Sequence, residues 1–481
     1  MGFKRELGLF DSTMIVAGSM IGSGVFIVSA DIARTVGSPG MLLFVWLVTG
    51  LLTLIAALSY GELAGLFPQA GGQYVYLREA FGPLAGFLYG WTLFTVIQTG
   101  TIAAVGMAFA KYTSALVPMV GEANVLISVG GFSVNAAQVF AIASIVGLTT
   151  LNARGVGLGK LIQNTFTTTK IVSVVALAAA GIAYGMSNGT LPAALGSLWT
   201  DGISPIVPDL SAAQQRSYGF ISRLGMPFLA AVAVSMVGSI FSSDAWNNIT
   251  FAAAEVKSPE RTIPRALLLG VMTVTVLYLL TNLAYIAVMP IGGLPSAATA
   301  IERGIAFASN DRVGAAAAEV IFGTSGGVIM AVLIMISTFG CNNGIILSGS
   351  RAYYAMASDG MFFRRAATLN TSGAPAASLW MQAVWASALC LSGTYSDLLD
   401  YVVFAVLIFY ILTIFAIFFL RFKRPELQRP IKAVGYPILP ALYILFAASI
   451  CICLLIYKPN YSWPGLLIVV SGVPVYYFWR R

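Results

Sequence analysis

Residues 11–33 read DSTMIVAGSMIGSGVFIVSADIA, and this stretch decides how the rest of the sequence is interpreted. It is apolar over the ~20 residues that a helix needs to cross a bilayer. Its middle nevertheless contains Gly18, Gly22 and Gly24. Each glycine lowers helix stability by ~1 kcal/mol and lets the backbone leave helical geometry. We predict a membrane helix that is interrupted at half depth; close packing of these glycines against another helix is the alternative.

A second interrupted helix is predicted over residues 232–256, VAVSMVGSIFSSDAWNNITFAAAEV. Ser242, Ser243 and Asp244 stand in its middle, and these residue types favour helix ends because their side chains hydrogen-bond nearby backbone groups. In an unbroken membrane helix they would lie at the depth of the hydrocarbon. The alternative is a polar patch that faces another helix.

The composition excludes a soluble protein. Of 481 residues, 58% are hydrophobic and 9% are charged, whereas roughly 25% are charged in an ordinary soluble domain. Histidine is absent, which excludes histidine-ligated metals and Ser-His catalysis, so we predict no metal, no cofactor and no enzymatic activity. The net charge of +8 is spread over short clusters between apolar runs, so no basic face for nucleic acid is expected.

Twelve apolar stretches of membrane-spanning length predict an all-α membrane protein with twelve transmembrane helices. They cover residues 10–36, 40–66, 83–112, 134–153, 162–185, 227–255, 264–289, 319–357, 376–394, 397–421, 437–457 and 463–479. Most of the 26 lysine and arginine residues fall in segments that lie inside if the N-terminus is cytoplasmic. This predicts a multi-pass protein of the cell (inner) membrane with both termini in the cytoplasm.

The order of the two interrupted spans indicates an inverted repeat. They are the first and the sixth, so a five-helix unit that is repeated once enters the membrane from opposite sides. The predicted units are residues 10–185 and 227–421, followed by two additional helices within 437–479. Each interruption frees backbone groups, which are costly in lipid unless something polar meets them. A half-helix N-terminus favours an anion and freed carbonyls favour a cation, and an amino acid carries both charges.

Several motifs follow one another along the chain. They are GSMIGSGVF at 18–26, FPQAGGQYVYLREAFG at 67–82, FSSDAWNNITFAAAEVKSPERTIPRAL at 241–267, TNLAYIAVMP at 281–290 and STFGCNNGIILSGSRAYYAMASDG at 337–360. Together they resemble the amino acid–polyamine–organocation (APC) superfamily, and in particular a bacterial member of its L-type amino acid transporter branch. The resemblance implies a LeuT-type fold, a 5+5 inverted repeat plus two C-terminal helices, with helices 1 and 6 unwound at mid-membrane. It also implies alternating access, in which helices 1, 2, 6 and 7 rock against the rest.

The resemblance further assigns a substrate site to the two interruptions. In the first span, the backbone N–H groups of Ser23 and Gly24 would bind the carboxylate of an amino acid, and Gly22 would allow its close approach. The carbonyl groups of Met20 and Ile21 would bind the ammonium group. The site would therefore be built largely from main-chain atoms.

In the sixth span, the resemblance implies that the carbonyls of Phe241 and Ser242 complete the ammonium site. The ring of Phe241 would form an outer lid, and Trp246 and Asn247 would line or brace the pocket. The position that matches Asp244 is usually a glycine in eukaryotic L-type members. The carboxylate of Asp244 either caps the second half of the helix or contacts the substrate ammonium, and the sequence leaves both interpretations open.

Lys170 lies in the middle of the fifth span, where an ammonium group costs at least ~2.5–3.5 kcal/mol. A static ion pair or hydrogen-bond clamp is one interpretation. The other follows from the resemblance: the ammonium would occupy the place of a sodium ion and bridge the broken first helix to Ser337 and Thr338. That interpretation predicts sodium-independent transport.

The remaining acids near the membrane have simpler interpretations. Glu62 and Glu255 lie near the cytoplasmic ends of their spans and are expected to pair with loop arginines or to cap neighbouring backbone. Arg351 and Asp359 flank the turn after the eighth span and are expected to belong to a cytoplasmic latch. The loop at 117–132 contains no cysteine, whereas eukaryotic L-type members use one there to join a heavy chain, so no disulfide-linked partner is expected.

These observations predict a secondary transporter of amino acids. No phosphate-binding GxxxxGK[ST] loop is present, which excludes primary pumping by this chain alone. The expected carrier is a sodium-independent exchanger or a proton-linked symporter that prefers neutral amino acids. The alternative substrates are cationic amino acids or polyamines, which an Asp244 facing the pocket would favour. A receptor without transport, or a channel, is the competing class.

Overall fold

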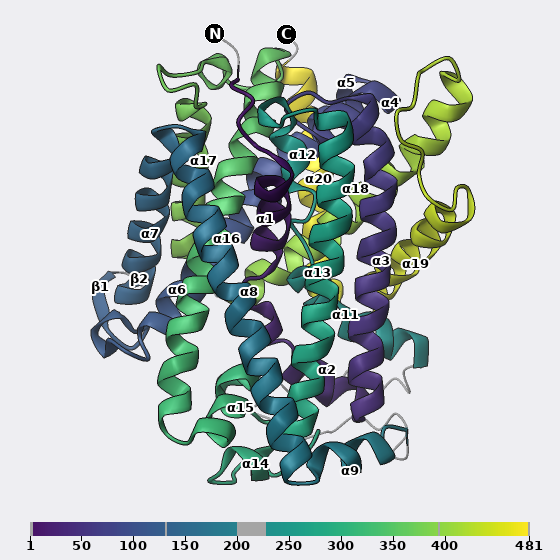
Figure 1. Cartoon of the computed structure of the whole chain (residues 1–481). Helices are drawn as coiled ribbons and strands as arrows, with labels where there is room; N and C mark the ends of the chain where they lie inside the picture. Colours follow the sequence, from purple (N-terminus) through teal and green to yellow (C-terminus); the bar gives the residue numbers. More distant parts are fainter. Residues whose placement is uncertain (1–2, 130–131, 200–227, 393–394, 480–481) are drawn as a thin grey trace.

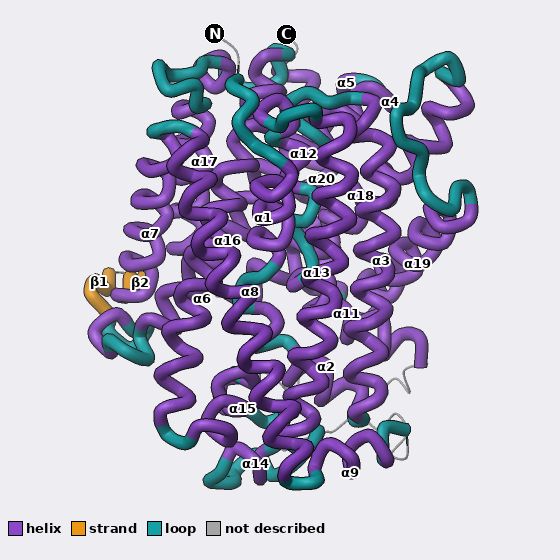
Figure 2. The backbone as a smooth tube through the Cα atoms, viewed as in Figure 1, coloured by secondary structure: helices purple, strands orange, loops and turns teal. Residues whose placement is uncertain are grey.

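The computed structural model describes residues 3–129, 132–199, 228–392 and 395–479, and most of these residues are helical (Figures 1 and 2). A two-stranded antiparallel hairpin, β1 (Val125–Val129) and β2 (Phe132–Asn135), lies beside the bundle. Both chain ends lie at the same end of the molecule. Of the predicted segments, residues 227 and 393–394 lie outside the described residues.

Within the described ranges, nine helical segments are long and apolar enough to cross a membrane. They are α3 (Pro39–Leu66), α5 and α6 (Pro83–Thr92 and Gln98–Thr113, joined by a π-turn at Leu93–Ile97), α7 (Ala136–Ala153), α8 (Val156–Ser187), α13 (Pro259–Val288), α16 (Ser325–Ser358), α18 (Tyr395–Lys423), α19 (Ile438–Tyr457) and α20 (Pro459–Trp479). The chain is therefore a multi-pass membrane protein.

Shorter helices complete the bundle and its two ends. The apolar ones are α1 (Leu9–Met20), α11 (Phe228–Ser242), α15 (Val313–Phe322) and α17 (Ala376–Ser392). The others are α2 (Ser29–Val36), α4 (Gln73–Phe81), α9 (Thr190–Gly196), α12 (Asn248–Phe251) and α14 (Ala300–Arg303), with single 3-10 turns at Gly24–Phe26, Pro118–Val120, Ala253–Glu255, Ser309–Asp311 and Arg364–Ala367.

The predicted span 319–357 differs from the structure at its start. Residues up to Phe322 belong to α15, and α16 begins only at Ser325. Gly323 separates them with φ +68°, a left-handed conformation that glycine adopts without strain. The apolar run therefore makes a turn that its hydrophobicity does not reveal.

The helices pack so that α1 lies inside the bundle. It contacts α8, α13 and α16, and α13 also packs along α3 and α8. In the last half of α1, Ile15 through Met20 are all buried. A short helix with buried sides and an early end needs polar partners for its last carbonyl groups.

At the end of the molecule that carries both termini, the N-terminal segment is attached to the segment after α12. The backbone N–H groups of Glu6 and Leu7 donate to the carbonyl of Glu255 at 2.9 and 3.0 Å. The side chain of Glu255 forms a two-pronged ion pair with Arg351 of α16, with N–O distances of 3.0 and 3.2 Å. The side chains of Arg351 and Glu255 are 1% and 2% exposed. Glu255 pairs with an arginine as predicted, but Arg351 lies within α16 and not in a loop.

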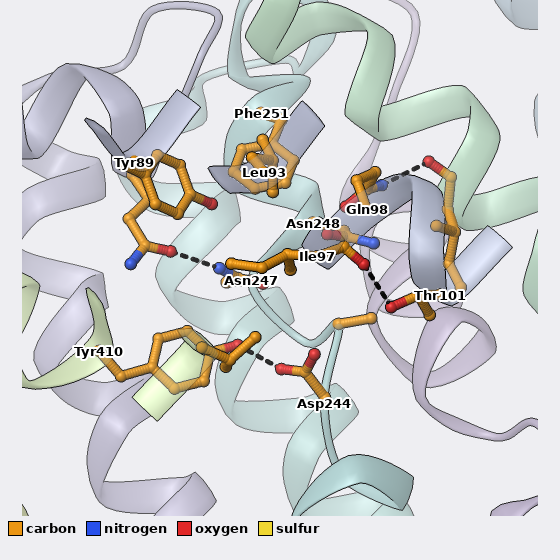
Figure 3. Close-up of a pocket in the computed structure, with 14 residues that line it drawn as sticks. Tyr89, Leu93, Ile97, Gln98, Thr101, Asp244, Asn247, Asn248, Phe251 and Tyr410 are labelled. Carbon is orange, nitrogen blue, oxygen red and sulfur yellow. Dashed lines mark hydrogen bonds between the residues drawn. The ribbon is translucent and has the colours of Figure 1, made fainter. Parts of the chain in front are cut away.

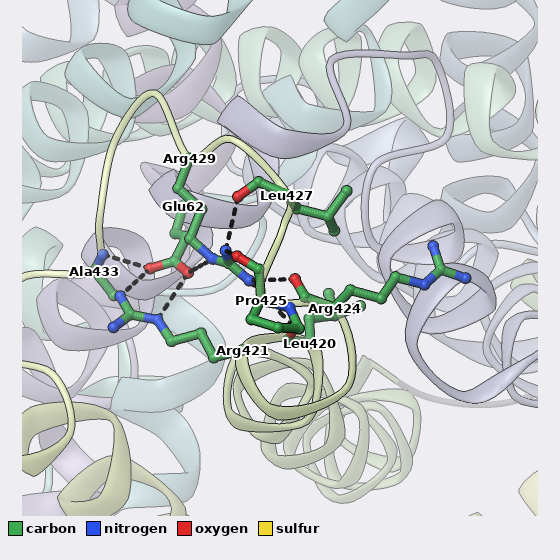
Figure 4. A network of polar contacts seen from close by, with 8 residues as sticks. All are labelled: Glu62, Leu420, Arg421, Arg424, Pro425, Leu427, Arg429 and Ala433. Carbon is green, nitrogen blue, oxygen red and sulfur yellow. Dashed lines mark hydrogen bonds and ion pairs between the residues drawn. The ribbon is translucent and has the colours of Figure 1, made fainter.

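Glu62 near the end of α3 is the centre of a second network (Figure 4). Its carboxylate accepts hydrogen bonds from Arg421 at 3.0 and 2.6 Å and from the backbone N–H of Ala433 at 2.7 Å. Arg429 Nε lies 3.2 Å from the same carboxylate. These contacts hold the segment between α18 and α19 against α3 and confirm the predicted pairing of Glu62.

Asp359 joins α16 to α4 at the same end. It accepts a hydrogen bond from the Tyr74 hydroxyl at 2.8 Å and forms an ion pair with Arg78. Burial, followed by the charge of Asp359, raises the pKa of Tyr74, so its hydroxyl stays a donor at neutral pH. Arg351 and Asp359 thus belong to two separate contacts of one closed end.

Replacement of Arg351 by methionine leaves Glu255 buried without its cation. Removing one partner of a buried pair typically costs about 3–5 kcal/mol, so the melting temperature of the purified protein in detergent should fall clearly. The double variant Arg351→Met with Glu255→Leu removes both charges and should regain most of this loss. A single variant as stable as the natural protein would contradict the contribution assigned to this pair.

Candidate functional site

The first half of the candidate site is the end of α1. The helix stops at Met20, and Ile21 has an extended conformation (φ −76°, ψ 92°). The chain turns again only at Gly24–Phe26, before α2 begins at Ser29. The last carbonyls of α1 and those of the next residues therefore lack helical partners.

Lys170 of α8 and Ser337 of α16 supply partners for these carbonyls. The Lys170 ammonium donates to the carbonyls of Gly18 and Ile21, the latter at 2.7 Å, and lies 3.5 Å from the carbonyl of Ser337. The Ser337 hydroxyl lies 3.1 Å from the carbonyl of Ile21 and 3.0 Å from that of Gly22. Lys170 is 1% exposed. The structure thus brings Lys170, Ser337 and the end of α1 together.

The Thr338 side chain does not take the role beside Lys170 that the resemblance implies. Its hydroxyl donates to the carbonyl of Ile334 in its own helix at 2.8 Å. Cys341, one turn further along α16, points its thiol at the carbonyl of Ser19, 3.0 Å away. Sequence reasoning assigned no role to Cys341, because a cysteine in an apolar run is typical of ordinary packing.

The second half of the site is the gap between α11 and α12. The first helix ends at Ser242, and the Asp244 N–H donates to the carbonyl of Phe241 at 3.1 Å. Ala245 has φ +63°, which is uncommon for a residue with a side chain and is typical of functional turns. Helix α12 begins only at Asn248.

The two gaps meet directly. A Cβ atom built on Gly24 would lie 2.7 Å from Cβ and 3.1 Å from Cα of Ser242, so only a glycine fits there. The hydroxyl of Tyr278 in α13 lies 3.0 Å from the carbonyl of Met20 and 2.9 Å from that of Ser242. A hydroxyl has one proton and can donate fully to only one of them at a time. The Tyr278 hydroxyl therefore lies between two carbonyls and can donate to either of them. The resemblance assigns both carbonyls to the substrate ammonium.

Aromatic and amide side chains brace the second gap. Trp246 is 1% exposed and packs edge-on against Tyr60 of α3, with ring centres 4.7 Å apart. The Asn247 amide donates to Gln73 of α4 at 2.9 Å, and Gln73 in turn donates to Thr413 of α18 at 2.9 Å. Trp246 and Asn247 thus fix the chain between α11 and α12, and Asn247 also lines a cavity.

This cavity has a volume of about 20 Å³, which is room for about one water molecule. Figure 3 shows its walls, which come from α4, α5, the π-turn, α6, α12, α16, α18 and the gap before α12. Its polar lining includes Gln98 of α6 and Asn248 of α12. The Asn248 Nδ2 atom is buried and has no hydrogen-bond partner among the described residues. Residues 20–24, all described, do not line this cavity.

Asp244 lies in the cavity wall, and its Oδ1 accepts a hydrogen bond of 2.5 Å from the Tyr410 hydroxyl of α18 (Figure 3). Asn247, the residue before α12, makes no side-chain capping bond. The Asp244 carboxylate also accepts a hydrogen bond from the backbone N–H of Ala245, so it both lines the cavity and holds backbone of the gap. Tyr410 and Tyr278 were missed in the sequence, because a tyrosine in an apolar run gives no local signal of its partner.

Long apolar helices, two shorter helices that end against each other, and a cavity with polar side chains beside the second gap are typical of a membrane transport protein. The amino acid permease family matches residues 7–477, and the chain belongs to this family within the APC superfamily.

Known transporters are similar over almost the whole chain. The b(0,+)-type amino acid transporter 1 of Mus musculus is 28% identical over 480 residues, which cover 99% of this chain and 88% of the relative. The large neutral amino acids transporter small subunit 2 and the Asc-type amino acid transporter 1 of Mus musculus are 27% and 28% identical, over 100% of this chain and 82% of each relative. The chain is thus similar to amino acid transporters, which supports a function in amino acid transport.

Proposed function

We propose that this protein is a secondary transporter that moves amino acids across the cell (inner) membrane by alternating access. The observation that carries the proposal is the contact between the gap after Met20 and the gap after Ser242. The two gaps bring peptide groups from two halves of the chain to one place, where a zwitterion can bind. Rocking of helices 1, 2, 6 and 7 against the rest of the bundle then opens the site to either side.

A LeuT-type arrangement of twelve spans supports this mechanism. Together with the nine long segments, α1 with α2, α11 with α12, and α17 would make three further crossings. An even number of crossings agrees with chain ends on one side (Figure 1), which we place in the cytoplasm. The proposed repeats are residues 10–185 and 227–421, with 437–479 as the additional pair.

The proposed substrate contacts are divided between the two gaps. The N–H groups of Ser23 and Gly24 take the carboxylate, and Gly22 allows its close approach. The ammonium group is taken by carbonyls from both gaps, those of Met20, Ile21, Phe241 and Ser242. Tyr278 would release the carbonyls of Met20 and Ser242 when the substrate arrives, because both bonds come from a single hydroxyl. Phe241 closes the outer side.

Transport is proposed to be independent of sodium. The Lys170 ammonium already contacts the carbonyls of Gly18 and Ile21 beside Ser337, and oxygen atoms of this kind are the ligands that a sodium ion would need. A second cation at the same oxygens would be repelled. No disulfide-linked partner is required, since the loop at 117–132 contains no cysteine.

Counterflow in proteoliposomes tests the proposal. Vesicles loaded with one unlabelled amino acid should take up the same labelled amino acid in a saturable way, with and without sodium, across a panel of neutral and cationic substrates. Saturable uptake that requires internal substrate means a carrier. Uptake that rises linearly with concentration means a channel, and binding without uptake means a receptor.

Neutral amino acids are the proposed substrates, and cationic amino acids or polyamines are the alternative that an exposed face of Asp244 favours. Uptake by the variant Asp244→Gly distinguishes these two substrate classes. If the substrates are neutral, the ratio of leucine to arginine uptake should stay above one and change little. A selective loss of arginine uptake from a protein that carried it would instead support the alternative.

A further inference from the structure

Asp244 is a carboxylate without a cationic partner. Among the described residues, no lysine or arginine lies within ion-pair distance of it. Its hydrogen-bond donors are both neutral: the hydroxyl of Tyr410 and the backbone N–H of Ala245. A charged carboxylate in a membrane helix bundle is costly unless a cation neutralises it. Asp244 therefore needs a positive charge that the described part of this chain does not supply.

Asp244 and Tyr410 separate two small cavities. The first is the cavity beside Asn248. The second lies between α3, α11, α18 and α19, and each has a volume of about 20 Å³. Asp244 and Tyr410 line both cavities, and each cavity has room for about one water molecule.

The groups that face this carboxylate are neutral or hydroxyl-bearing. The titratable side chains in the two walls, besides Asp244, are tyrosines: Tyr89 on α5, Tyr410 on α18 and Tyr443 on α19. The side of α3 presents Thr49 and Thr53, and no other charged residue lines either cavity in the described chain. Hydroxyl groups and single waters are the elements from which proton paths are built.

We propose that Asp244 takes up and releases a proton in each transport cycle, so that this carrier couples substrate movement to a proton. The inference rests on the proposed transport function and deepens it. On the side of the membrane with the higher proton concentration, Oδ2 of Asp244 takes a proton from water and forms an O–H bond. Oδ1 of Asp244 keeps its hydrogen bond to Tyr410. On the other side the O–H bond breaks and the proton returns to water. The amino acid crosses as a neutral zwitterion, so one positive charge moves in each cycle.

In this conformation the cavity leaves room beside Asp244 for a water molecule that carries a proton, but not for a substrate. A volume of about 20 Å³ admits a water molecule, whereas an ammonium group on a carbon chain needs several times more. A proton needs only a hydrogen-bonded water at the carboxylate. Neutralisation by a proton also agrees with a preference for neutral amino acids.

The experiment measures accumulation driven by a pH gradient in proteoliposomes, with the panel amino acid that gives the fastest counterflow as the probe. One proton per substrate allows accumulation of up to about tenfold for about one pH unit. The natural protein should show such accumulation. Asp244→Asn cannot bind the proton, so the ratio of uptake with and without the gradient should fall to about one. Glu319→Gln, which neutralises an exposed acid on α15, is the matched control and should keep the gradient response.

A second variant gives a readout that a structural defect would not produce. Tyr410→Phe removes a hydrogen bond to the ionised carboxylate, so protonation becomes easier. The pH at which gradient-driven uptake is half-maximal should therefore move to a higher value. This measurement decides the proposal if Asp244→Asn does not fold.

The outcomes separate this inference from the proposed function. Counterflow without any response to the gradient would leave a carrier and overturn the role of Asp244. A full gradient response in Asp244→Asn, or an unchanged half-maximal pH in Tyr410→Phe, would also overturn it. Absence of counterflow for every amino acid in the panel would overturn the transport function itself.

Discussion

Alanine in place of Gly24 will reduce counterflow by about 100-fold, because displacements of about 1 Å at a binding site can have effects of this size. The added Cβ would lie 2.0 Å from Oγ, 2.7 Å from Cβ and 3.1 Å from Cα of Ser242. The Ser242 hydroxyl can rotate, but the backbone of α11 cannot move without opening the contact between the two gaps. Uptake by purified, folded protein in proteoliposomes measures the effect.

Gly147→Ala in α7 is the matched control, because Gly147 lies outside both gaps. A Cβ at Gly147 would meet no neighbouring atom within 4 Å. Its effect on counterflow should therefore be much smaller than that of Gly24→Ala. Equal losses for the two variants would mean that the contact between Gly24 and Ser242 is not the critical one.

Methionine in place of Lys170 will slow exchange more than it weakens substrate binding. The variant keeps a side chain of similar length but leaves the carbonyls of Gly18 and Ile21 without their donor. Leaving a buried hydrogen-bond acceptor unpaired costs about 1–3 kcal/mol, which corresponds to about 5- to 150-fold in rate if the cost falls on the conformational step.

Comparison of exchange rates with equilibrium binding separates these effects. Binding of an amino acid by Lys170→Met, measured by calorimetry in detergent, should change less than the rate of counterflow. Ser337→Ala removes a single hydroxyl from the same carbonyls and should have an intermediate effect. Unchanged exchange in Lys170→Met would refute a role of the ammonium in transport.

Features that depend on the local sequence could be predicted from the sequence alone. Glycines near position 22 and the run from Ser242 to Asp244 mark where α1 and α11 end, because these residue types disfavour a helix interior wherever they stand. The pairing of Glu62 and Glu255 with arginines follows from the cost of a buried acid. The particular arginines could not be named, since they lie far away in the sequence.

Features that depend on packing between helices far apart in the chain could not be predicted from the sequence. Tyr278 and Tyr410 reach the two gaps from α13 and α18, and nothing in their apolar neighbourhoods distinguishes them from other tyrosines. Thr338 was expected beside Lys170 with Ser337, but adjacent residues on a helix point about 100° apart. Its hydroxyl bonds within α16 instead.

The Glu62 network also has a consequence for biosynthesis. Glu62 leaves the ribosome 359 residues before Arg421, so α3 enters the bilayer long before the guanidinium groups that will neutralise its acid exist. An unpaired acid at that position holds the end of α3 near water until α18 arrives. A nascent chain that stops short of Arg421 therefore keeps an exposed negative charge that membrane quality control can recognise as unfinished.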